Sequence, residues 1–99
     1  MCGITGIINF NSDGISLSEL KRMADSIAHR GPDGEGFFNN HSVGFGHRRL
    51  AIIDLSKDAD QPFISDDKKY ILVYNGEVYN FQEIKKELIQ KGYHFKSST

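Results

Sequence analysis

Cys2 follows Met1 directly in this chain of 99 residues. Methionine aminopeptidases usually accept a small second residue, and removal of Met1 would place a thiol and a free α-amino group on Cys2. The unperturbed pKa values of these groups are about 8.5 and about 7.7–8.0, so the amine can take the thiol proton near neutral pH. A nucleophile that carries its own base needs no histidine partner. The pattern indicates an N-terminal nucleophile, and the alternative is a structural thiol that happens to lie near the terminus.

A second polar segment, Asn75-Gly76-Glu77, follows an apolar stretch over residues 70–74. Asn-Gly is first of all a tight-turn dipeptide. Acyl transfer, however, needs donors for a developing oxyanion, and the Asn75 amide with the Gly76 N–H could supply them. Glu77 would add a carboxylate suited to a substrate ammonium group. The segment is a candidate oxyanion hole, with a plain turn as the alternative.

Arg48 and Arg49 end a predicted strand, so their side chains should point to opposite faces. One of them could bind a substrate carboxylate through two parallel hydrogen bonds while the other remains solvated. The spacing does not say which one. Exposure of both side chains to solvent is the alternative.

Several other chemistries find no support in the sequence. The single cysteine excludes an internal disulfide and a cysteine-rich zinc module. The four histidines have no paired ligand spacing, so no metal site is expected. No P-loop or dinucleotide glycine signature is present, so ATP binding of those kinds is not expected in this segment.

The charge and the apolar runs bear on partners and location. Twelve Lys and Arg against thirteen Asp and Glu give a net charge of −1, which offers no electrostatic case for nucleic acid or an anionic membrane. The longest apolar runs are only a few residues, so no bilayer-spanning helix is predicted. Asn9, Asn11 and Asp13 interrupt any apolar segment near the start, which argues against a secretory signal. The expected compartment is the cytoplasm.

The elements that must position these residues are short strands and two helices. Residues 4–10 predict a buried strand, and a capping box, Ser16-x-x-Glu19, predicts a helix over about Leu17–His29 that Gly31 ends. A second helix is expected to begin at Asn80, with Glu83 in its first turn, and to end before Gly92.

Further strands are expected between the helices. They are Gly36–Asn39, Val43–Arg49, Ala51–Asp54 and Tyr70–Tyr74, with a hairpin turn over residues 39–42. Residues 70–74 are mostly apolar, so burial on both faces is expected there.

Strands bracketed by two helices predict an α+β layered domain. No shift in composition marks a domain boundary at Thr99, and five short strands would leave sheet edges unpaired. We therefore expect residues 1–99 to be the N-terminal portion of a longer domain.

Five short motifs together resemble the N-terminal glutaminase domain of glutamine-hydrolysing asparagine synthetases. This domain belongs to the class II amidotransferases within the N-terminal-nucleophile hydrolases. The motifs are Met1–Gly6, His29–Gly34, His47–Asp54, Gln61-Pro62 and Tyr74–Asn80, in order along the whole chain. The resemblance implies that residues 1–99 are the N-terminal part of an αββα sandwich of antiparallel strands.

The resemblance also implies a role for the matched residues. Cys2 would be the nucleophile with its own α-amine as general base, and Asn75 with the Gly76 N–H would form the oxyanion hole. Arg49 would hold the α-carboxylate of L-glutamine and Glu77 would face its α-ammonium group. The pocket would be lined by the backbone of Leu50, Ala51, Ile52 and Ile53. Residues 29–33 would shape a supporting loop.

The implied reaction is hydrolysis of the glutamine side-chain amide to glutamate and ammonia. In the family, the ammonia passes to a C-terminal synthetase domain that amidates aspartate. ATP and Mg²⁺ are expected only in that domain, and no cofactor is expected within residues 1–99. One alternative is a parent protein that amidates another carboxylate, such as a sugar or a peptide. Another is an inactive fragment that self-associates into a homo-oligomer through exposed strand edges.

Overall fold

The first sheet of the protein contains three antiparallel strands. The computed structural model describes residues 2–11, 13–51 and 59–95. The strands are β1 (Gly3–Ile8), β2 (Gly34–Asn39) and β3 (Val43–Arg49), in the order β1-β3-β2. The hairpin turn between β2 and β3 is confirmed, because Asn40 N–H donates to the Val43 carbonyl at 2.9 Å. The strands predicted over Gly36–Asn39 and Val43–Arg49 are confirmed, with β2 beginning two residues earlier than expected. The strand predicted over residues 4–10 is present as β1 but ends at Ile8, and its predicted burial is wrong, because Ile4 and Ile8 of this edge strand are 49% and 65% exposed.

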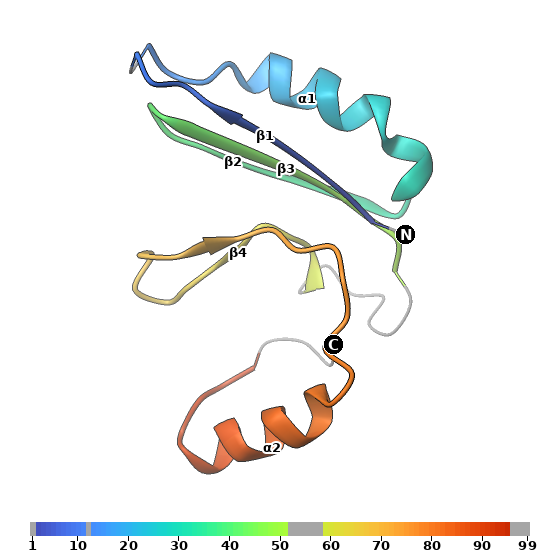
Figure 1. Ribbon diagram of the computed structural model, residues 1–99, viewed down its shortest axis with the longest axis vertical. Coiled ribbons are helices and arrows are strands. Elements are labelled where there is room, and N and C mark those ends of the chain that lie inside the picture. Colours follow the sequence, from blue (N-terminus) through green and yellow to red (C-terminus); the bar gives the residue numbers. More distant parts are fainter. Residues whose placement is uncertain (1, 12, 52–58, 96–99) are drawn as a thin grey trace.

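One face of this sheet is covered by α1 (Leu17–Ser26) (Figure 1). The predicted cap is present, since the Ser16 side chain accepts from the Glu19 N–H at 3.3 Å. The helix is shorter than predicted, because residues 28–30 form a separate 3₁₀ turn, η1 (Ala28–Arg30). Leu20 and Ala24 are fully buried beneath the helix. Close packing depends on Gly44 in β3, where a Cβ atom would lie 2.7 Å from the Leu20 side chain.

A small second sheet lies on the side of the first sheet that faces away from α1 (Figure 1). It consists of β4 (Phe63–Ile64) and β5 (Ile71–Leu72), paired antiparallel. The expectation of a strand over Tyr70–Tyr74 buried on both faces is wrong, because β5 is two residues long and Leu72 is 53% exposed. The apolar composition is present, but no described layer packs on the outer side of this hairpin. Ala51 lies outside any strand, and the rest of the predicted strand Ala51–Asp54 lies outside the described residues.

The second helix, α2 (Phe81–Gln90), begins after Asn80 as predicted. Asn80 occupies the N-cap position, but its side chain makes no capping hydrogen bond. No residue of α2 is buried. Along the 43 Å long axis, the elements follow one another in the order α1, first sheet, β4–β5 hairpin and α2 (Figure 1).

This layered arrangement of mixed helices and antiparallel strands confirms the predicted α+β class. The radius of gyration is 14.8 Å, against about 13 Å for a compact chain of this length. The larger radius of gyration agrees with the open arrangement of the β4–β5 hairpin and α2, which leave much of their surface exposed. Among the described residues, no helix is long and apolar enough to cross a membrane.

Candidate functional site

The Cys2 thiol lies where the start of β1 meets the end of β3. Gly3 pairs with Arg48 in the sheet, which brings Cys2 beside the chain that leaves β3. The Leu50 backbone N–H donates to Cys2 Sγ at 3.3 Å, and the Leu50 carbonyl lies 3.9 Å from the same sulfur. Cys2 is half-buried. The sheet register thus fixes the thiol against the predicted pocket-lining residue Leu50.

The turn after η1 holds the same strand ends in place. Arg30 Nε donates to the Cys2 carbonyl at 3.1 Å. Asp33 N–H donates to the Arg49 carbonyl at 3.0 Å, and the Asp33 carboxylate accepts from the Ala51 N–H at 2.8 Å. The predicted supporting loop therefore contacts the backbone of Cys2 and of both residues that flank Leu50.

Arg48 and Arg49 point to opposite faces, as the strand period predicts. Arg48 lies on the α1 face, where it donates to the Glu35 carboxylate at 2.6 Å and to the Gly31 carbonyl at 3.0 Å. Arg49 lies on the other face, is 8% exposed and forms an ion pair of 2.9 Å with Asp60. Neither side chain is simply solvent-facing, so the alternative interpretation of this pair is wrong.

The Asn75–Glu77 segment is anchored through the residue that precedes it. The Gln61 side chain donates to the Tyr74 carbonyl at 3.0 Å and accepts from the Tyr74 N–H at 2.5 Å. The Gln61 carbonyl in turn lies against β2, only 1.9 Å from the position of a Cβ on Gly36. The candidate oxyanion segment therefore starts from a point fixed against the first sheet.

The structure brings part of the predicted site together. Cys2, Arg49, Leu50 and Ala51 lie at one end of the first sheet. Asn75, Gly76 and Glu77 are exposed, and no hydrogen bond in the described part of the chain joins them to Cys2. Their predicted roles remain predictions. Ile52 and Ile53 lie outside the described residues.

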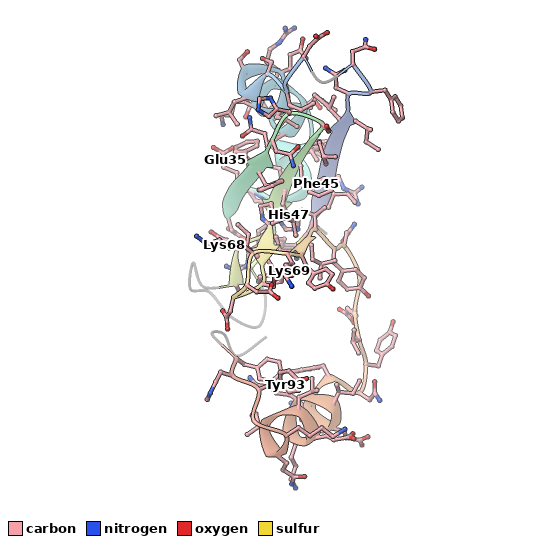
Figure 2. All side chains as sticks on the ribbon, turned by 90° about the vertical axis from the view of Figure 1, so that its left-hand side faces the viewer. Glu35, Phe45, His47, Lys68, Lys69 and Tyr93 are labelled. Carbon is pink, nitrogen blue, oxygen red and sulfur yellow. The ribbon has the colours of Figure 1, made fainter. Side chains whose placement is uncertain are left out.

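His47 begins the His47–Asp54 motif, but its burial was not predicted from the sequence. It is 1% exposed, and neither ring nitrogen has a hydrogen-bond partner among the described residues. Figure 2 shows it on β3, at the end of the sheet near the β4–β5 hairpin. Burial lowers the pKa of His47, while the Tyr74 backbone and the Asp60 carboxylate act in the opposite direction.

No metal-ligand cluster lies beside the thiol in the part of the chain that the structure describes. Within the described ranges, no three His, Cys, Asp or Glu side chains are grouped as metal ligands would be. The residues that sequence reasoning missed are Asp60, the partner of Arg49, and the anchoring side chain of Gln61. The Gln61-Pro62 motif pointed to this stretch, but it gave no sign of the long-range contacts.

Comparison with known proteins supports the same class. The glutamine amidotransferase domain family matches residues 1–99, so the chain belongs to this family. Asparagine synthetase [glutamine-hydrolyzing] 1 of Bacillus subtilis is 40% identical over 100% of this chain and 16% of its own length. Asparagine synthetase [glutamine-hydrolyzing] 1 of Arabidopsis thaliana is 37% identical over 89% of this chain and 15% of its own length. Amidase chry2 of Gibberella zeae is 42% identical, again over 89% of this chain and 15% of its own length.

These comparisons confirm the resemblance to the N-terminal region of asparagine synthetases. The homologous region of those relatives is their glutaminase half. The chain spans about one sixth of the length of the Bacillus subtilis protein.

Proposed function

We propose that this chain contributes the glutamine-hydrolysing site of an asparagine-synthetase-type amidotransferase, with L-glutamine as the substrate. The observation that carries the proposal is the hydrogen bond of 3.3 Å between Leu50 N–H and Cys2 Sγ. It places the thiol beside the backbone that follows Arg49, a residue whose side chain is only 10% exposed. A thiol and a buried cation so arranged suit a substrate with an α-carboxylate at one end and an amide at the other.

The reaction follows from the chemistry of Cys2 and the Asn75 segment. Once Met1 is removed, the α-amine of Cys2 takes the thiol proton while the sulfur attacks the side-chain amide carbon. The Asn75 amide and the Gly76 N–H stabilise the oxyanion. Collapse of the tetrahedral intermediate breaks the C–N bond, and the proton leaves with ammonia. Water then hydrolyses the γ-glutamyl thioester to glutamate and restores the thiol.

Substrate binding is assigned to residues on both sides of the thiol. Arg49 binds the α-carboxylate of glutamine, and Glu77 faces its α-ammonium group. Of the predicted pocket-lining residues that the structure describes, Leu50 and Ala51 supply backbone beside the thiol. A guanidinium shielded from water interacts with a carboxylate more strongly than an exposed one does, and the Arg49 side chain is only 10% exposed.

The ammonia is proposed to pass to a C-terminal synthetase domain that uses ATP and Mg²⁺ to amidate aspartate. The names of the Bacillus subtilis and Arabidopsis thaliana relatives support this acceptor. A different carboxylate acceptor is the second candidate, because a relative with 42% identity, Amidase chry2, is not named as an asparagine synthetase. A cytoplasmic location is proposed with it, since a reducing compartment keeps the Cys2 thiol free.

Covalent labelling tests the glutaminase site directly. The reagent is an L-glutamine analogue with a chloroketone in place of the side-chain amide, and the readout is the intact mass with peptide mapping. We expect loss of Met1 and one adduct on Cys2, with L-glutamine slowing the labelling.

Two controls make this experiment specific. The Cys2→Ala variant should gain no adduct, and the D-enantiomer of the analogue should react far more slowly than the L-form. Retention of Met1, or equal rates with the two enantiomers, would contradict the proposed function.

A further inference from the structure

Asp60 lies against Arg49 and has no role in the function proposed above. Its Oδ1 atom accepts a hydrogen bond from Arg49 Nη1 at 2.9 Å, and the two side chains are 25% and 10% exposed. We propose that Asp60 is a positioning residue that orients the Arg49 guanidinium for the α-carboxylate of the substrate. This inference rests on the proposed function, because it concerns the same binding site.

The carboxylate of Asp60 is held in place by its neighbours in the chain. Ala59 is 4% exposed, so the backbone before Asp60 is buried. Gln61 follows it, with a side chain hydrogen-bonded to both backbone groups of Tyr74 and a carbonyl set against Gly36. With both neighbours fixed, Asp60 behaves as a part of the site rather than as a mobile surface acid.

Gly34 provides the space in which this carboxylate lies. Gly34 is the register partner of Arg49 in the β2–β3 pairing, so both residues face the same side of the sheet. A Cβ atom on Gly34 would lie 3.0 Å from Asp60 Oδ1 and 3.2 Å from Oδ2. The absence of a side chain at this position allows the Asp60 carboxylate to sit level with the Arg49 guanidinium.

The physical benefit of the pair comes from the length and charge of arginine. An arginine side chain loses much rotamer freedom when it is fixed, and binding substrate to an unfixed one would include that loss. A guanidinium this far from water also needs a counter-charge before the substrate arrives. Asp60 meets both needs: its hydrogen bond to one terminal nitrogen restricts the Arg49 side chain, and its carboxylate provides the counter-charge.

A second role for Asp60 predicts the opposite change in glutamine affinity. If Asp60 merely occupied the place of the substrate carboxylate, its removal would tighten glutamine binding. If it positions Arg49, its removal weakens binding and leaves the chemistry at Cys2 unchanged. The direction of the change in glutamine affinity therefore distinguishes the two.

The experiment compares Asp60→Ala and Asp60→Asn with wild type in the intact protein. The readouts are the L-glutamine concentration that half-protects Cys2 from iodoacetamide, and the KM and kcat of glutamine hydrolysis. We expect Asp60→Ala to raise the half-protecting concentration and KM about tenfold with kcat within about twofold. Asp60→Asn should raise them less, because its amide oxygen can still accept from Nη1.

Glu35→Gln is the matched control. It neutralises the partner of Arg48 in a pair of 2.6 Å at the same strand end but on the opposite face, so glutamine affinity should stay at the wild-type value. Gly34→Ala should raise the half-protecting concentration as well, but by less than Asp60→Ala, because its Cβ would lie 3.0 Å from Asp60 Oδ1 and would push the carboxylate only slightly. If Asp60→Ala does not fold, Asp60→Asn and Gly34→Ala test whether Asp60 positions Arg49.

The outcomes distinguish a failure of the positioning role of Asp60 from a failure of the proposed function. Unchanged or tighter glutamine protection in the Asp60 variants would overturn the positioning role, and so would an equal loss in Glu35→Gln. Failure of glutamine to protect Cys2 in wild type would overturn the proposed function itself, and the positioning role with it.

Discussion

Leu50 donates its backbone N–H to the Sγ atom of Cys2 at 3.3 Å, although the two residues are 48 positions apart in the chain. The contact follows from the antiparallel register in which Gly3 pairs with Arg48. A strand pair is stiffer than a loop, so a thiol fixed in this way keeps its position relative to Arg49. The geometry of the proposed nucleophile is therefore a property of the first sheet.

Replacement of Cys2 by alanine tests the chemistry without disturbing the fold. We expect Cys2→Ala to abolish glutamine hydrolysis, because the variant lacks the sulfur that attacks the amide carbon. The free energy of unfolding should change by about 1 kcal/mol or less, since sulfur is a weak hydrogen-bond acceptor and the residue is half-buried. Ammonia release and urea unfolding measure the two effects. Turnover equal to wild type would rule out Cys2 as the nucleophile.

Replacement of Gln61 by alanine tests the anchoring of the candidate oxyanion segment. The change removes both hydrogen bonds to the Tyr74 backbone, one residue before Asn75. Because small misplacements of catalytic groups are costly, we expect kcat to fall by about tenfold or more. The rate of Cys2 alkylation by iodoacetamide should not change. Gln82→Ala, on the exposed surface of α2, is the matched control and should keep wild-type kcat. An unchanged kcat in Gln61→Ala would argue against a role for this segment in catalysis.

The sequence predicted those features that depend on neighbouring residues. The Ser16 capping box identified the start of α1, and strand alternation placed Arg48 and Arg49 on opposite faces. The bounds of β3 also agree with the predicted Val43–Arg49. These signals act within a few residues, so they are visible without the three-dimensional structure.

Other features depend on contacts between distant segments and were not predictable. Alternation does not reveal which face α1 covers, so it could not identify the arginine that pairs with Asp60. Apolar composition predicted burial for the strand near Leu72, but burial requires a second layer and Leu72 is 53% exposed. The Gln61 contact to Tyr74 spans 13 positions and likewise has no local signature.

A methyl group at Gly36 tests the contact between the first sheet and the Gln61 backbone. Its Cβ would lie 1.9 Å from the Gln61 carbonyl oxygen, so that segment must move away from β2. We expect Gly36→Ala to lose about 1–3 kcal/mol of unfolding free energy and to lower kcat, since Gln61 anchors Tyr74. Gly6→Ala is the control in β1, where the nearest atom to the new Cβ lies 3.5 Å away. Similar stability and kcat in the two variants would show that the Gln61 contact does not matter.

His47 makes the stability of the protein depend on pH. Burial, the main influence, lowers its pKa in the folded state below the ordinary value of 6.5. The unfolded chain therefore binds the proton more readily, so the contribution of neutral His47 is fully present above about pH 7.5 and is lost as the pH falls below 6.5. In urea unfolding between pH 5 and pH 8, we expect the unfolding free energy to decrease toward acid by up to about 1.4 kcal/mol per pH unit.

The variant His47→Gln separates this effect from other titrations. It removes the titrating ring, so the slope between pH 5 and about 6.5 should become shallower even if the protein is less stable overall. The hydrogen bond from Lys21 lowers the pKa of Glu35 below 4.5, so the contribution of Glu35 is lost mainly below pH 4.5 and affects only the acidic end of this window. The same slope in His47→Gln as in wild type would assign the pH dependence to other groups. A shallower slope would show that the buried imidazole between β3 and the Tyr74 backbone must remain neutral for the fold to be stable.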